Sequence, residues 1–278
     1  MTDSLPDDHA RDHEAREEAF VDAVIRAGDA LGSPPSPDYR IDGYRAATDE
    51  VEDDFVQATL DEDTFVELAV HHSDDDHTYM VFFDGSATWD IPGTSAYRAL
   101  HITRDVAART FTFAASVHPT VPFAQNWLIQ RGCPANQIDV TNPDGPRPAD
   151  ADTSRLEQQL RTSGTRYRII DTYTHDPVPG HDGGQTWILT QDQDPVAHAA
   201  PYRLFVEETT LTSHQYTLRE GAFTTVEEAR RWLNDPTTPL PPAPPSPANA
   251  TARRAPQQGT PLALPPRPVA PPRPPHRR

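Results

Sequence analysis

The densest group of side chains able to carry chemistry lies at positions 71–77, which read His-His-Ser-Asp-Asp-Asp-His. A second group pairs His175 with Asp176 and His181 with Asp182. Imidazoles and carboxylates gathered in this way can ligate a divalent metal ion. The sequence therefore offers a metal-site hypothesis with the ligands His71, His72, His77, His175 and His181. The opposing interpretation is that both groups occupy hairpin ends, where aspartates favour turns for local reasons.

Other groups with possible chemistry carry less information. Asp84 and Asp90 flank Trp89 and would be the pair to nominate for glycosidase-like acid/base chemistry, but 42 acidic residues permit many such pairs. Cys133 is the single cysteine, and no base lies near it in the sequence. The set Asp192, Asp194 and His198 fits a turn. The motifs of phosphate loops, dinucleotide folds, zincins and α/β-hydrolases are missing, so no cofactor is expected and no catalytic residue is assigned.

Most of the candidate residues named above lie within or next to a segment that occurs twice in the chain. Displacing the sequence by 105 positions gives eight identities over the 32 positions 97–128 without a gap. They pair Tyr97-Arg98 with Tyr202-Arg203, Thr112 with Thr217, Thr120-Val121 with Thr225-Val226, Ala124 with Ala229, and Trp127-Leu128 with Trp232-Leu233. An internal repeat of this kind indicates two structural units with the same order of elements.

Each copy carries four strand patterns followed by a helix pattern. β-Branched and aromatic residues fill the strands, and Asp, Gly and Pro clusters separate them. The strands are predicted at 64–72, 77–84, 97–103 and 109–117, and again at 165–174, 185–191, 202–208 and 214–219. The helices after them place Trp127 and Trp232 on matching apolar stripes, which favours a role in packing over base or sugar stacking.

Charge and proline divide the chain further. Residues 1–63 have a net charge of −14 (19 acids, five arginines), residues 64–235 of −10 (23 acids, 13 arginines), and residues 236–278 of +6 (six arginines). The last span holds 16 of the 31 prolines, which lack the amide donor of helices and ladders. All 24 basic residues are arginine, which is typical of a high G+C bacterium or of a salt-adapted organism.

The predicted fold class is α+β, with two tandem β4α pseudo-repeats, an N-terminal amphipathic helix and a disordered proline-rich C-terminal tail. The boundaries are an acidic segment with a helix at 1–37, a first repeat at 38–135, a linker with a short helix at 136–163, a second repeat at 164–235 and the tail at 236–278. The N-terminal helix spans Glu14 to Leu31, and the linker helix spans Ser154 to Arg161.

The leading functional hypothesis is a non-catalytic cytoplasmic protein-interaction module. It would be a monomer with pseudo-two-fold symmetry that meets an unidentified protein partner through a sheet face or through the seam between the copies. The acidic excess argues against binding to nucleic acid or to a membrane. One alternative is a hydrolase of the glycosidase or phosphoesterase type with a carboxylate or His/Asp site, and a second is an acidic nucleic-acid mimic.

Overall fold

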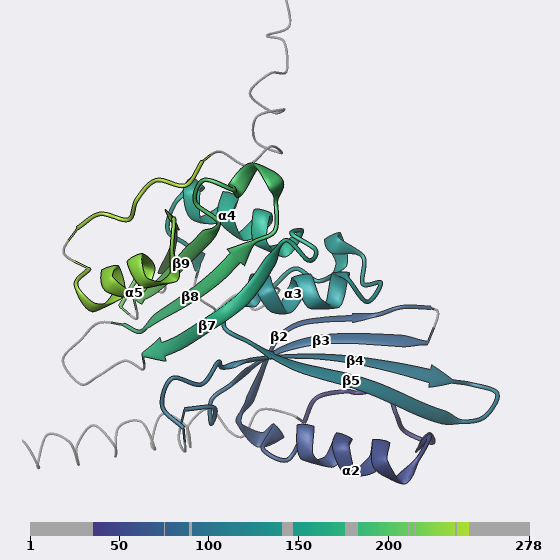
Figure 1. Cartoon of the computed structure of the whole chain (residues 1–278). Coiled ribbons are helices and arrows are strands. Elements are labelled where there is room, and N and C mark those ends of the chain that lie inside the picture. The colour runs from purple at the N-terminus through teal and green to yellow at the C-terminus, as the bar shows by residue number, and fades with distance from the viewer. Residues whose placement is uncertain are drawn as a thin grey trace, which may run out of the picture. The chain divides into compact units, whose positions relative to one another are not determined.

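The computed structural model describes residues 36–74, 76–88, 91–140, 147–175, 183–210, 212–213, 215–236 and 238–244. The helix expected at Glu14 to Leu31 and most of the proline-rich tail lie outside these residues. Within them the chain is α+β and forms two five-stranded sheets, each with helices against it (Figure 1).

The first unit has the strand order β1-β5-β4-β3-β2, in which β1 is parallel to β5 and the other neighbours are antiparallel. Its elements are β1 (Arg45–Ala46), α2 (Asp49–Ala58), β2 (Phe65–His72), β3 (His77–Asp84), β4 (Tyr97–Asp105), β5 (Thr110–His118) and α3 (Val121–Ile129), with short 3₁₀ helices at Glu62–Thr64 and Ala135–Gln137.

The second unit repeats this plan with the order β6-β10-β9-β8-β7, and β6 is again the parallel edge strand. Its elements are β6 (Arg147–Pro148), α4 (Ala151–Arg161), β7 (Tyr167–His175), β8 (Gln185–Asp192), β9 (Tyr202–Thr210), β10 (Gln215–Phe223) and α5 (Val226–Asn234), with a 3₁₀ helix at Pro195–Ala197. The two-unit architecture and all eight predicted strands are confirmed.

The repeat is larger than the sequence indicated, because each unit begins with a short strand and a helix that precede the four-stranded meander. In the first unit these are β1 and α2, which were not predicted. Residues 147–161, expected to belong to a linker, form their counterparts β6 and α4. Even an irregularity is duplicated: β2 bulges between Glu67 and Ala69, and β7 bulges 102 positions later, between Ile169 and Asp171.

Each sheet buries both of its faces. In the first sheet, Met80, Phe82 and Ile102 pack with Phe55 of α2, while the opposite face packs Val81 against α3. In the second sheet, α4 covers one face and α5 covers the other. We name each face after its helix, so that the α2 and α4 faces are equivalent, and so are the α3 and α5 faces.

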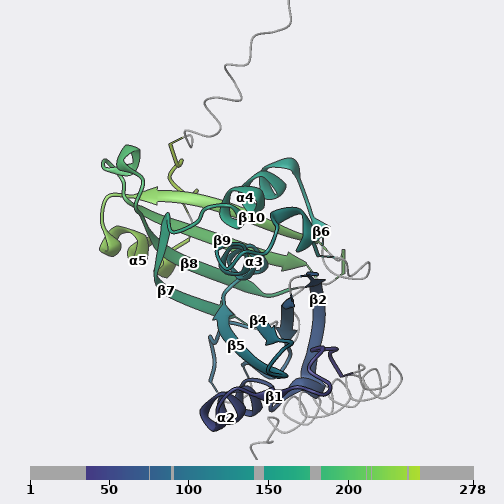
Figure 2. The same ribbon diagram turned by 90° about the vertical axis from the view of Figure 1, so that its right-hand side faces the viewer.

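Helix α3 also joins the two units. It lies beside α4 of the second unit (Figure 2). Phe123 of α3 packs among Leu156, Leu160, Phe205 and other buried residues of the α4 face. The α3 face of the first unit therefore meets the α4 face of the second. A two-fold axis would bring equivalent faces together, whereas this contact joins unlike faces, so the units are related head to tail here and not by the expected pseudo-two-fold symmetry.

The two repeated tryptophans occupy equivalent places. Trp127 is half-buried against the α3-face core, and Trp232 is half-buried against the α5-face core. The indole Nε1 of Trp232 donates a hydrogen bond of 2.8 Å to the carbonyl of Thr238. Both tryptophans thus pack inward from the helices that follow the meanders, as the repeat predicted.

The first residues of the predicted tail pack against β10. Leu240 belongs to the α5-face core, the amide of Ala222 donates to the carbonyl of Pro241 at 3.1 Å, and Gly221 forms an isolated bridge with Pro242. A Cβ atom at Gly221 would lie 2.6 Å from Leu240, so glycine permits this close approach. The packed part of the chain therefore continues past Pro236, where the proline content had placed the start of the tail.

Phe123→Ala should cost about 3–5 kcal/mol of unfolding free energy, because it removes a buried ring from the contact between the units. Phe113→Ala, which removes a half-buried ring on the α2 face, is the control and should cost less. Urea denaturation measures both values. An equal or smaller loss for Phe123→Ala would contradict the role assigned to α3.

Candidate functional site

An aspartate–arginine pair is duplicated where the third strand of each meander begins. Arg98 Nε donates to Asp84 Oδ2 at 2.6 Å, and Arg203 Nε donates to Asp192 Oδ2 at 3.1 Å. In both copies the other carboxylate oxygen accepts the backbone amide two residues later, at 2.9 Å in the first copy and 3.0 Å in the second. Each aspartate therefore closes its own turn and fixes the next strand.

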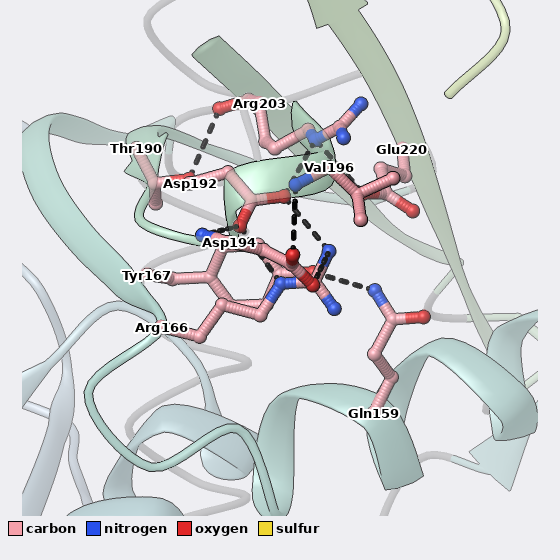
Figure 3. A network of polar contacts seen from close by, with 9 residues as sticks. All are labelled: Gln159, Arg166, Tyr167, Thr190, Asp192, Asp194, Val196, Arg203 and Glu220. Atoms are coloured by element: carbon pink, nitrogen blue, oxygen red, sulfur yellow. Dashed lines mark hydrogen bonds and ion pairs between the residues drawn. The ribbon is translucent and has the colours of Figure 1, made fainter. Parts of the chain in front are cut away.

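The pair in the second unit is the more deeply buried. Arg203 is 1% exposed and Asp192 is 4% exposed. Arg166 adds two hydrogen bonds of 2.8 Å to Asp192, and Glu220 lies 3.7 Å from Arg203 (Figure 3). Burial alone would raise the pKa of Asp192, but the hydrogen bonds from Arg166, the Asp194 amide and Arg203 outweigh it and hold the pKa below its usual value.

This charge network is part of the scaffold. Its acidic and basic groups pair with one another, although Arg203 Nη1 is buried without a hydrogen bond among the described residues, and its central pair recurs in the first unit. There, Thr64 and Ala115 occupy the positions of Arg166 and Glu220, so the first unit lacks these two charges, and the Thr64 hydroxyl donates to Asp84 Oδ1 at 3.4 Å instead. A small cavity lies beside Arg98, lined in part by Tyr39, Phe65 and Phe82.

The strongest candidate site lies where the two units meet. Four side chains form it, Tyr97 of β4, Glu157 of α4, Glu207 of β9 and Tyr216 of β10, which we call the seam cluster. The Tyr216 hydroxyl donates a hydrogen bond to Glu157 Oε1. Glu207 is only 8% exposed and lies on the α4 face, since its neighbour Val206 packs on the α5 face.

The seam cluster holds protons tightly. Burial, together with the nearby charge of Glu157, raises the pKa of Glu207 to about 8. Burial also raises the pKa of Glu157, although the hydrogen bond from Tyr216 and the charge of Arg161 oppose it. The pKa values of Tyr97 and Tyr216 are raised as well, first by burial and then by neighbouring carboxylates. Perturbed carboxyl groups of this kind gather at functional sites.

The duplication provides a reference for the seam cluster. In the first unit, Phe55, Ile102 and Phe111 occupy the positions of Glu157, Glu207 and Tyr216. The rings of Phe55 and Phe111 are in edge contact at 5.3 Å, where the second unit has the Tyr216–Glu157 hydrogen bond. The same backbone positions thus hold apolar core in one copy and acidic and phenolic groups in the other.

Hydroxyl groups and the β3–β4 connection border the seam cluster. Thr186 pairs with Glu207 across the strands and donates to Thr174 at 3.2 Å. The connection reaches the edge of the second sheet, where the Thr174 amide donates to the Gly93 carbonyl at 3.2 Å. A Cβ atom at Gly93 would lie 2.3 Å from the Tyr173 ring, and its φ of 84° also favours glycine.

The structure does not gather the predicted metal ligands. His71 and His77 lie on the α3 face, one on each side of Tyr79, while His72 contacts Thr78 at 3.0 Å on the opposite face. His175 packs on Tyr173 in the second sheet, and His181 is outside the described residues. In the part of the chain that the structure describes, no group of three or more His, Cys, Asp or Glu residues is placed to hold a metal ion.

The contacts of the remaining candidate residues indicate roles in the fold and not in catalysis. Asp84 is held by Arg98, and its supposed partner Asp90 lies outside the described residues. Cys133 is buried, and burial raises the pKa of its thiol to about 11, which is unfavourable for a nucleophile. Asp192 belongs to the buried charge network.

Comparison with protein-family models, with curated proteins and with solved structures finds no significant match. Across the described residues, none of the helices combines the length and apolar character that crossing a bilayer requires.

Glu207→Gln should abolish a pH dependence of stability. Because the pKa of Glu207 is about 8 in the folded protein and normally 4.5, the folded state holds this proton more tightly. The unfolding free energy should fall by roughly 2–4 kcal/mol between pH 5 and pH 8 in the wild type. Denaturant titrations should show a flatter profile for Glu207→Gln, while Glu208→Gln, at an exposed neighbouring position, should keep the wild-type slope.

Asp192→Asn should destabilise the protein by about 3–5 kcal/mol, because it removes the nearer of the two counter-charges of the buried Arg203 and leaves only Glu220, 3.7 Å away. Asp84→Asn should cost less, about 1–3 kcal/mol, since the Arg98 side chain is 30% exposed and can hydrate. The lowered pKa of Asp192 means that its stabilisation is present above pH 4 and is lost as the pH falls below that value. Equal losses in the two variants at pH 7 would refute the assigned difference.

Proposed function

We propose that this protein is a non-catalytic cytoplasmic interaction module whose seam cluster receives a basic group from a protein partner. The observation that carries the proposal is the divergence between the copies. Three positions that are Phe, Ile and Phe in the first unit are Glu157, Glu207 and Tyr216 in the second.

A cation is the ligand that such a cluster favours. Ionised carboxylates at a buried site are costly unless an opposite charge accompanies them. An arginine guanidinium or a lysine ammonium would supply that charge and donate hydrogen bonds to the carboxylates and to phenolic oxygens. Residues 1–235 have a net charge of −24 (42 acids, 18 arginines), which would attract a basic partner over a longer range.

The cation should displace a proton from the seam cluster. With a pKa of about 8, Glu207 is largely protonated at pH 7, and a bound guanidinium favours its ionised form. Binding at pH 7 should therefore release close to one proton per cation, and binding at pH 9 should release almost none. Proton release distinguishes the seam cluster from exposed acidic residues that attract cations without changing their own ionisation.

Calorimetry with N-acetyl-arginine amide, in buffers of different ionisation enthalpy, measures that release directly. The matched ligand N-acetyl-citrulline amide has a similar shape without the charge and should not bind. Binding without proton release at pH 7, or equal binding of citrulline, would refute the proposal.

Replacing the seam cluster by the residues of the first unit is the sharpest structural test. The triple variant Glu157→Phe, Glu207→Ile, Tyr216→Phe should lose arginine binding. It should also gain stability at pH 8, because apolar groups that replace buried charges are often stabilising by about 1–4 kcal/mol. Glu208→Gln should keep both wild-type properties. A stable triple variant that still binds arginine with proton release would exclude the seam cluster.

One observation favours the hydrolase alternative, namely that Glu207 remains protonated near neutral pH, as a general acid does. A hydrolase should turn over p-nitrophenyl glycosides or phosphates, and Glu207→Gln should abolish the turnover. Turnover with that dependence would replace the interaction role.

A further inference from the structure

Two histidines that the sequence separates by 24 residues meet on the α3 face of the first sheet. His77 Nδ1 lies 3.0 Å from His101 Nε2, and the rings are stacked with centroids 5.1 Å apart. His77 belonged to the metal-site hypothesis, whereas His101 did not. Strand pairing therefore joins His77 to a histidine that the metal-site hypothesis did not include.

The separation of these two nitrogens matches joint ligation of one metal ion. Imidazole binds zinc at about 2.0–2.1 Å, so two ligands at angles of 90–110° have nitrogens about 2.9–3.4 Å apart. We propose that His77 and His101 form an open two-ligand site for a divalent transition metal ion. Water, or a donor from another molecule, would fill the remaining positions. In the absence of metal the same geometry serves as a hydrogen bond between the rings.

The surroundings prepare the two rings for this role. Tyr79 stacks on His101 with centroids 4.5 Å apart and an interplanar angle of 5°, which holds the imidazole in place. Thr103 Oγ1 lies 3.1 Å from the same His77 Nδ1, and a metal ion bound at this nitrogen would replace that hydrogen bond. Both histidines are half-buried, which leaves solvent access.

The nitrogen donors determine the expected metal. Imidazole suits Cu²⁺, Ni²⁺ and Zn²⁺, while Mg²⁺ and Ca²⁺ prefer oxygen ligands. The general order of affinity places Cu²⁺ above both Ni²⁺ and Zn²⁺. The positively charged guanidinium of Arg131 acts electrostatically on His101, and it would oppose a cation bound there.

The second unit again provides a natural comparison. Gln185 and Val206 occupy the positions of His77 and His101, so the equivalent place in the second sheet lacks both imidazoles. The residues of the second copy are therefore suitable replacements, because an equivalent strand already accommodates them. They supply the variants His77→Gln and His101→Val.

Titration of the full chain with Cu²⁺, followed by electron paramagnetic resonance and calorimetry at pH 7, tests the site. The wild type should show a copper signal with two nitrogen ligands, and Zn²⁺ should compete for it. His77→Gln and His101→Val should each weaken the tightest Cu²⁺ binding more than tenfold, since even outer-shell changes cost about 10–100-fold in metal affinity. His175→Gln removes an imidazole from the second sheet and should have no effect on this binding.

Because the chain has 12 histidines, the difference between the variants is the decisive quantity. Arg131→Gln should tighten Cu²⁺ binding by removing a nearby positive charge. Circular dichroism of each variant without metal reports whether the fold is retained. If folded His101→Val and His175→Gln bind Cu²⁺ equally, the pair is only a hydrogen bond and the proposed site is excluded.

Discussion

The structure depends on one helix that is buried on more than one side because both units pack against it. Helix α3 buries six of its nine residues, Pro122, Phe123, Ala124, Gln125, Asn126 and Leu128. Its equivalent α5 buries only Ala229 and carries Arg230 and Arg231 where α3 has Gln125 and Asn126. Charged side chains keep the outer side of α5 in water. Helix α5 therefore resembles the polar terminal element of a repeat protein, which covers the last repeat and exposes its outer side to water.

Polar groups within the same contact specify how the units meet. The Asn126 side chain donates to the Gly164 carbonyl at 2.9 Å and accepts from the Gly164 amide at 2.8 Å, while Gln125 donates to the Ile138 carbonyl at 2.7 Å. Apolar packing alone tolerates small shifts, whereas buried amides require their partners at fixed positions. These three hydrogen bonds fix α3 against the residues that flank α4 in the chain.

The sequence predicts the meanders well because their signals are local. Alternating β-branched and aromatic residues mark each strand, and the offset of 105 confirms the pattern in a second copy. The sequence did not predict helix α2, and the reason is physical. Only Val51 and Phe55 pack inward from it, among five acidic residues, so the apolar stripe is thin although Thr48 caps the helix. The two-residue strands β1 and β6 are too short to form a pattern.

The candidate site was harder to predict because its members come from four elements. Glu207 lies between Val206 and Glu208, and alternation alone does not show that this carboxyl points into a contact with the first unit. The aligned copies do contain a signal. In the alignment, Glu207 takes the position of Ile102 and Tyr216 takes the position of Phe111, where a core residue is expected. The contact between His101 and His77 could not be predicted for a related reason, since only strand pairing brings the two residues together.

The two copies also separate what the fold requires from what it merely tolerates. The aspartate–arginine pair occurs in both, and an acidic group buried with its counter-charge closes the same turn each time. The seam cluster occurs in one copy only, and the other copy demonstrates that Phe55, Ile102 and Phe111 fill the same backbone positions with apolar contacts. Apolar residues at such positions are commonly more stable than carboxyls that must keep a proton or find a cation. Stability alone therefore does not explain Glu157 and Glu207, and the proposed basic ligand would offer a compensation that the fold itself does not provide.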